Sequence, residues 1–294
     1  MSFMLRAAID ALRAGEGRAG GLKFNKLVFE LQRELAKSKN KKFHAVVPHR
    51  WYLYGAVVDD LALHQLVEFD HPEDELRSNV RWVGGPRRAL PAGYEGIRDE
   101  IEQVCGAFVR KYHGREGIGP MLRAHYENAP LEFQRRFLEW SLTIRDALKG
   151  YADDVPETQF KLFRAAVDAY PSDLEQRLSP SFERLVLFLE PLVHGRTPGD
   201  LKTLARCGDA MWDFWVTFCL FLSLKHNEGL SPQRLGGFRN RAETELPAYK
   251  RRLTAFLEQQ YLEERGSLPL AAGGTVPIRK FVFSEVMREL DGDA

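Results

Sequence analysis

The most hydrophobic stretch of the chain, Met211 to Leu224 (MWDFWVTFCLFLSL), sets the first limit on the fold. A helix that crosses a bilayer needs about 20 consecutive apolar residues. This run is shorter, contains Asp213 and is bounded by Asp209 and Lys225. An apolar segment of this kind predicts a helix buried on all sides rather than a membrane span. We therefore expect it to be the central helix of a bundle, and we expect no membrane partner.

The segments around this run carry apolar residues at helical spacing and end at glycine or proline. Helices are predicted over residues 131–148, 157–170, 180–194, 200–226, from about 244 to 265, and 280–290. Helices joined by short connections pack most simply as a bundle. The predicted fold class is mainly α, with a helical bundle over residues 129–294.

The first 128 residues have a different order of elements. Two helices are predicted over residues 3–14 and from Leu22 to about residue 37, and another begins at Val58. Two strands follow over residues 66–69 and 80–83, joined by an acidic loop. A short strand over 43–47 and helices over 94–113 and 120–126 complete the prediction. Helices followed by a two-stranded ribbon are the order of a winged helix, so we predict a winged-helix-like α+β domain over residues 1–128.

The net charge of +1 conceals an uneven distribution. Residues 13–50 hold ten basic and three acidic residues, so this segment alone has a formal charge of +7. Flexible cations on one helix and the loop after it can contact phosphate or an acidic protein. The alternative is a solvated helix face with a soluble loop. The predicted nucleic-acid or acidic-partner residues are Lys23, Lys26, Arg33, Lys37, Lys39, Lys41, Lys42 and Arg50.

Three aromatic residues follow the basic loop closely. Trp51, Tyr52 and Tyr54 could stack on a base or pack against a partner protein. Strand alternation would place Trp51 and Leu53 on one face and Tyr52 and Tyr54 on the other. One pair would then be core and the other exposed or covered. We predict an aromatic interface formed by Trp51, Tyr52 and Tyr54.

Two carboxylates in the apolar helix are the weak candidates for a metal site. Asp209 and Asp213 are four residues apart and so share a helix face, where they could hold Mg²⁺. The alternative is that Asp213 forms an ion pair with an arginine such as Arg206 or Arg184. The histidines do not have the spacing of a helical zinc site, and the chain has no phosphate-binding loop or GxSxG motif. We predict no catalytic residues, no metal and no cofactor.

The cysteine pattern indicates the redox state of the cellular compartment. Cys105, Cys207 and Cys219 are scattered and odd in number, which favours a reducing environment over a disulfide framework. The N-terminal segment is an amphipathic helix pattern with Asp10 inside it, which differs from a signal peptide. We therefore expect a cytoplasmic protein.

The N-terminal third resembles the Panacea (SocA-like) antitoxin domain and the related YwgA-like proteins. The matching residues are Lys26-Leu27-Val28-Phe29, Tyr52-Leu53-Tyr54-Gly55, Leu61 and Leu66-Val67-Glu68, and residues 122–130 (LRAHYENAP) resemble a later element of the family. Ala56-Val57 stands where the family usually has proline and a polar or aromatic residue. The resemblance implies a protein that neutralises a toxin or regulates a partner, as an antitoxin or a defence-complex subunit does. Residues 131–294 show no such resemblance.

These observations favour a non-enzymatic binding or regulatory protein. Its basic N-terminal module would contact a partner protein, DNA or RNA, and formation of a homo-oligomer stays open. One alternative is a metal-dependent nuclease or similar effector with carboxylates in the helical bundle. Another is a structural subunit of a larger complex, with the aromatic residues at an interface.

Overall fold

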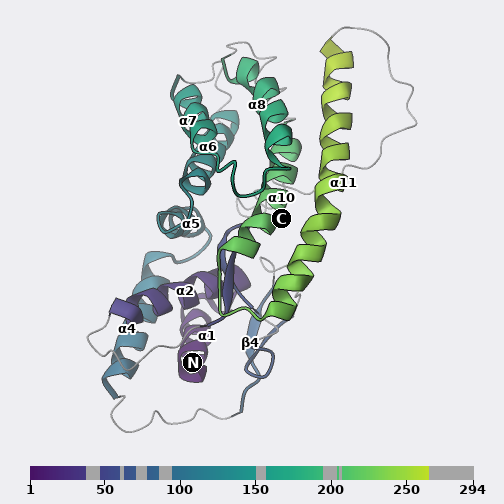
Figure 1. Cartoon of the computed structure of the whole chain (residues 1–294). Coiled ribbons are helices and arrows are strands. Elements are labelled where there is room, and N and C mark those ends of the chain that lie inside the picture. The colour runs from purple at the N-terminus through teal and green to yellow at the C-terminus, as the bar shows by residue number, and fades with distance from the viewer. Residues whose placement is uncertain are drawn as a thin grey trace. The chain divides into compact units, whose positions relative to one another are not determined.

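The computed structural model describes residues 1–37, 47–59, 63–70, 78–85, 95–149, 157–194, 204 and 207–264. These residues are mainly helical (Figure 1), so the predicted fold class is confirmed at that level. The chain forms two compact units. Unit 1 contains Met1–His125 and His226–Leu235, and unit 2 contains Tyr126–Lys225 and Gly236–Ala294. The first division lies three residues before the predicted boundary at 128, whereas the return of residues 226–235 to unit 1 was not predicted.

Three helices form most of the core of unit 1. Helices α1 (Ser2–Glu16), α2 (Gly21–Lys37) and α4 (Glu95–Lys111) pack on one another, as Figure 1 shows. Their facing sides bury apolar residues at helical spacing, including Leu5, Ile9, Leu27, Leu31 and Ile101. Helix α5 (Ile118–Tyr126) follows and supplies Met121 and Leu122 to the same core.

Two small antiparallel sheets complete unit 1. One has the order β2-β1-β5, from β1 (His49–Tyr52), β2 (Gly55–Val58) and β5 (Asn227–Glu228). The other pairs β3 (Val67–Phe69) with β4 (Val80–Trp82), which confirms the predicted strands over 66–69 and 80–83.

The predicted helix does not begin at Val58, although Leu63 is helical and residues 60–62 lie outside the described residues. Val58 is the last residue of β2 and pairs with His49 across a tight hairpin. Gly55 has a φ of 100°, a left-handed conformation that lets the chain reverse after Tyr54. The predicted strand over 43–47 lies outside the described residues except for Val47.

Unit 2 is built around the apolar helix α10 (Gly208–Lys225). Helices α6 (Glu132–Lys149), α7 (Glu157–Asp168) and α8 (Ser179–His194) belong to the same unit. Twelve residues of α10 are buried, so the prediction of a buried helix is confirmed. Its rings meet those of α6 directly, since Phe137 and Trp215 stack with centroids 4.9 Å apart and an interplanar angle of 3°. Among the described helices, none has the length and apolar character that a membrane span requires.

Helix α11 (Pro232–Glu264) begins earlier than the predicted residue 244. Pro232 occupies the first turn, where its missing N–H costs nothing. The Ser231 hydroxyl accepts a hydrogen bond from the backbone N–H of Arg234 at 3.3 Å, which caps the helix. The last predicted helix, 280–290, lies outside the described residues.

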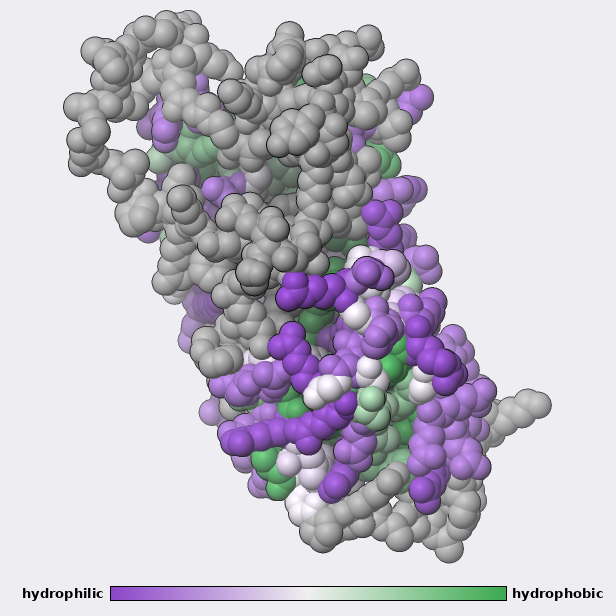
Figure 2. All heavy atoms as spheres, turned by 180° about the vertical axis from the view of Figure 1, so that it is seen from behind, coloured by the Kyte–Doolittle hydropathy of each residue, from purple (hydrophilic) through white to green (hydrophobic). Residues whose placement is uncertain are grey.

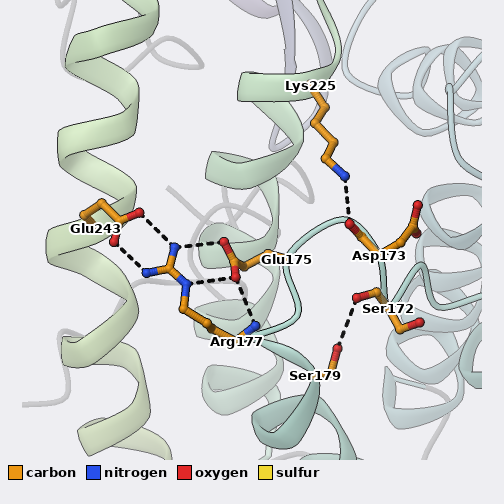
Figure 3. Close-up of polar contacts among 7 residues, drawn as sticks. All are labelled: Ser172, Asp173, Glu175, Arg177, Ser179, Lys225 and Glu243. Atoms are coloured by element: carbon orange, nitrogen blue, oxygen red, sulfur yellow. Dashed lines mark hydrogen bonds and ion pairs between the residues drawn. The ribbon is translucent and has the colours of Figure 1, made fainter.

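The connection between α7 and α8 is fixed to α11 by one arginine. The Arg177 guanidinium donates to both carboxylate oxygens of Glu243 at 2.7 and 2.8 Å and to both of Glu175 at 2.9 Å (Figure 3). Lys225, at the end of α10, donates to the backbone carbonyl of Asp173 in the same connection. Figure 2 shows that hydrophilic residues dominate the coloured part of the face drawn there, with small hydrophobic patches between them.

Candidate functional site

The predicted cationic face of α2 is partly inside the protein. Lys23 is 7% exposed, and its ammonium group pairs with Glu16 and donates to the carbonyls of Tyr112 and Gly114, each at 2.7 Å. Lys26 is 1% exposed and donates to the carbonyl of Ala56 at 3.0 Å. Neither of these two predicted binding residues faces solvent, because carbonyls from other elements accept from their ammonium groups in the interior.

The remaining predicted cations divide into three groups. Arg50, in β1, is also buried, with its guanidinium 4.9 Å from the ring centroid of Tyr52. Arg33 and Lys37 lie near the exposed end of α2, and both form ion pairs with Glu34. The Lys37 side chain is 62% exposed, the most of any predicted cation in the described part of the chain. Lys39, Lys41 and Lys42 lie outside the described residues.

The predicted aromatic interface is likewise mostly interior. Trp51 and Tyr52 are 6% and 8% exposed, and Tyr54 in the turn is partly buried against the core of unit 1. Strand alternation does not expose one pair, because all four residues of β1 are buried. The Trp51 ring lies 5.5 Å from Phe29 and 5.3 Å from His125, measured between centroids. Of the two outcomes left open for the second pair, exposed or covered, the structure shows burial for both Trp51 and Tyr52.

These buried groups meet in a polar network that the sequence did not suggest. His125, at the end of α5, accepts a hydrogen bond at Nε2 from the backbone N–H of Ala56 at 3.0 Å. The carbonyl of the same residue accepts from Lys26, so both peptide groups of Ala56 are satisfied by side chains of other elements. Two residues after Ala56 in β2, the N–H of Val58 donates to the Asn25 side chain at 2.8 Å, and Asn25 in turn donates to the carbonyl of Gly21. The β1–β2 hairpin is thus fixed to α2 and α5 by side chains that recognise its backbone.

The network requires His125 to be neutral. An N–H donor already points at Nε2, so a proton on that nitrogen would place two donors against each other. Burial lowers the pKa of His125 well below its usual range, and electrostatic interactions with Lys26, Arg33 and His49 act in the same direction. The neutral imidazole must therefore be the tautomer that carries its proton on Nδ1. The imidazole is therefore a fixed hydrogen-bond acceptor.

The Asp209–Asp213 pair lies in unit 2, against α11. Both residues line a pocket of about 220 Å³ together with Tyr249, Arg252 and Gln260. Arg252 donates to Asp213 at 2.7 Å and also to Glu245, so Arg252 and not the predicted Arg184 pairs with Asp213, while Arg206 lies outside the described residues. Burial raises the pKa of Asp213 and outweighs the opposite effect of Arg252. Within the described residues, no group of three or more His, Cys, Asp or Glu side chains is placed to hold a metal ion.

Sequence reasoning missed His125, Arg252 and Tyr249. The available sequence signal for a close neighbour was Gly55 after the aromatic residues, because a glycine lets another group approach the backbone. In the structure that group is His125, whose Cδ2 would lie 2.3 Å from a Cβ on Gly55. Fold and site together define a mainly helical protein of two units with a buried lysine–histidine network in the first. No family model, curated protein or solved structure matches the chain in the comparisons made.

Proposed function

We propose that the protein is a non-enzymatic binding or regulatory protein that contacts an acidic partner through the basic end of α2. One observation carries this proposal. The cationic run KSKNKK, residues 37–42, begins at Lys37, whose side chain is 62% exposed where α2 ends. Four lysines in six residues attract phosphate or carboxylate groups through long-range electrostatics.

The burial of Lys23, Lys26 and Arg50 narrows the proposed contact surface. Those three cations contribute to the interior of unit 1, so Arg33 and the run 37–42 are the residues we assign to the partner. Arg33 and Lys37 can leave their ion pairs with Glu34 to bind a partner's phosphates with little loss of stability. Exposed ion pairs contribute only about 0–1 kcal/mol to the free energy of unfolding.

The finer description of the fold belongs to the same proposal. We propose that unit 1 works as a winged-helix-like module and that the helices of unit 2 form a bundle that mediates assembly. The element order supports the first part, since α1 and α2 precede two antiparallel hairpins. The resemblance to the Panacea domain would make the partner a toxin or another subunit of a defence complex. The buried thiols of Cys105 and Cys219 support a cytoplasmic location.

The metal-dependent nuclease is not our preferred alternative, because Arg252 already engages Asp213. A structural subunit that uses Trp51, Tyr52 and Tyr54 as an interface is less favoured, because the first two rings are buried.

A pull-down from the native host, with and without nuclease treatment, tests the proposal. The wild-type chain is expected to capture a partner that a variant with Lys37, Lys39, Lys41 and Lys42 all changed to glutamate does not. Loss of the partner after nuclease treatment would identify a nucleic acid, and retention would identify a protein. A matched control changes four exposed cations of unit 2 to glutamate: Arg135, Arg184, Arg241 and Arg251. Capture of the same partner by both charge-reversed chains and the wild type would contradict the proposal.

A further inference from the structure

The pocket of about 220 Å³ in unit 2 is lined by one face of α11 and by the first turns of α10. Tyr249, Leu253, Phe256 and Gln260 occur at i, i+4, i+7 and i+11, so they share a face of α11. Helix α10 contributes Ala210, whose side chain is a single methyl group and leaves room beside it. The lining from α11 therefore has an apolar stretch, Leu253 and Phe256, between two polar side chains.

Three of the described residues that line the pocket are charged, and each is already engaged within the protein. Arg252 donates to Asp213 at 2.7 Å and also pairs with Glu245. Asp209 has an interaction of its own within the protein. A charged ligand would lose its hydration on entering and would gain no free counter-ion from these three residues. The described lining therefore does not favour a ligand with a net charge.

The Tyr249 hydroxyl is a neutral polar group of the pocket that lacks a partner. The residue is 0% exposed, and its hydroxyl has no hydrogen-bond partner among the described residues. Burial raises the pKa of Tyr249, so the hydroxyl keeps its proton at neutral pH and can donate as well as accept. A buried hydroxyl without a partner costs free energy that a hydrogen bond to a ligand would recover. Since native structures leave few such groups unsatisfied, an uncharged polar atom of a ligand fits here.

The volume and the apolar stretch define the size of the ligand. A cavity of about 150 Å³ is sufficient to hold a benzene ring. The pocket volume of about 220 Å³ therefore accommodates one ring with a short polar substituent. Leu253 and Phe256 provide apolar surface for such a ring, and the ring of Phe256 adds the favourable contact that aromatic pairs make.

We propose that this pocket binds a small neutral molecule, a body the size of one aromatic ring that carries an uncharged hydrogen-bonding group such as a carboxamide. The carboxamide oxygen accepts a hydrogen bond from the Tyr249 hydroxyl, and the ring lies against Leu253 and Phe256. The site belongs to unit 2, whereas the proposed partner surface is on α2 of unit 1, so either assignment can fail without the other.

The first test is isothermal titration of the full-length protein with three probes of one shape and different charge: benzamide, benzamidinium and benzoate. Benzamide is expected to bind with a Kd of roughly 1 mM, as a ligand of this size reaches at an ordinary affinity per atom. The cation and the anion are each expected to bind at least about tenfold more weakly, because neither gains a free counter-ion. Tighter binding of either ion than of benzamide would overturn the proposal.

Variants place the probe in this pocket. Tyr249→Phe should weaken benzamide binding roughly fivefold, the effect of one neutral hydrogen bond. Ala210→Leu should abolish it, because the larger side chain fills part of the pocket. Tyr170→Phe removes the same hydroxyl from a residue that does not line the pocket, so this control should bind benzamide as the wild type does. If Ala210→Leu does not fold, the comparison of the two tyrosine variants still decides the matter.

The same tyrosine variants test whether the Tyr249 hydroxyl is free for a ligand. The Tyr170 hydroxyl is hydrogen-bonded with Ser179, so Tyr170→Phe should lower the midpoint of urea unfolding. Tyr249→Phe without ligand should leave the midpoint unchanged or raise it, because it removes a buried group that has no partner. A midpoint lowered as much as in Tyr170→Phe would show that the protein itself satisfies the hydroxyl, and would overturn the proposal. So would undetectable binding of benzamide, or binding that Tyr249→Phe leaves unchanged.

Discussion

His125 Nε2 and the backbone N–H of Ala56 form a 3.0 Å hydrogen bond that joins the end of α5 to the start of the β1–β2 hairpin. The carbonyl of Ala56 is held at the same time by Lys26 of α2. A single hairpin residue therefore connects three elements of unit 1, and a proton on His125 Nε2 would remove the imidazole's share of that connection.

The stability of the protein should fall as the pH drops below the usual histidine range. His125 has a folded-state pKa well below 6.5, so the unfolded chain takes up a proton that the folded chain does not. The contribution of His125 to the free energy of unfolding is fully present above pH 6.5. It declines below that pH by up to about 1.4 kcal/mol per pH unit. His125→Gln, whose amide oxygen can accept from Ala56, should flatten that decline in urea unfolding measured at several pH values. An unchanged slope in the variant would show that His125 does not titrate between the two states.

Gly55→Ala should be far more costly than an alanine at another left-handed glycine. Both Gly55 and Gly17 have positive φ, 100° and 74°, so each alanine pays about 1–2 kcal/mol for its backbone conformation. Only at Gly55 does the new methyl group meet other atoms, 2.3 Å from His125 Cδ2 and 2.6 Å from Nε2. We expect an additional loss of about 1–3 kcal/mol for Gly55→Ala in chemical unfolding, as for other overpacked sites. Equal losses for the two variants would place His125 away from the hairpin.

Lys26→Met should raise the pKa of His125 toward its usual value. The Lys26 charge is the largest electrostatic cause of the low pKa after burial, and methionine fills similar space without it. NMR titration of the imidazole protons measures this directly. Arg123→Gln, an exposed charge removal on α5, is the control and should leave the titration as in the wild type. A titration of Lys26→Met that matches the wild type would contradict the described network.

Residues 226–235 should contribute to the stability of unit 1 through one ion pair. The Asp59 carboxylate is 3% exposed and is held by Arg234 at 2.7 Å, with a second contact at 3.0 Å. Arg234→Met would leave that carboxylate buried without this cation, at an expected cost of about 2–3 kcal/mol, below the ~3–5 of a fully buried pair because Arg234 is partly exposed. The double change with Asp59→Asn should recover most of the loss. Additive effects of the two changes in a double-mutant cycle would show that the pair does not interact.

Local sequence patterns were sufficient to predict helices, because the spacing of apolar residues along the chain determines a helix without reference to distant residues. The Leu27–Leu31 stripe predicts α2, and the apolar run of α10 predicts a buried helix, because spacing along the chain determines both. The charge of Lys26 predicted exposure and was misleading, since its partner carbonyl lies 30 residues away on a hairpin whose position depends on tertiary packing. The sequence contained the start of α11 as Ser231-Pro232, a capping residue before a first-turn proline, although the prediction did not use it.

The candidate site was less predictable than the fold, because it depends on contacts between distant residues. His125 and Ala56 are 69 positions apart, and Asp213 and Arg252 are 39 apart. No spacing rule links such residues, so the sequence could suggest Asp213 as a paired carboxylate but not its partner.

The salt dependence of binding tests the central claim most directly. Affinity for short DNA and RNA duplexes, or for the acidic partner recovered from the host, is measured across a salt series for three chains. These are the wild type, the Lys37/Lys39/Lys41/Lys42→Glu variant and the Arg135/Arg184/Arg241/Arg251→Glu control. We predict that wild type and control bind with an affinity that falls steeply with salt, and that the first variant loses that binding. Binding that is absent at low salt, or that is equally strong in all three chains, would contradict the assignment of the α2 cations to a partner.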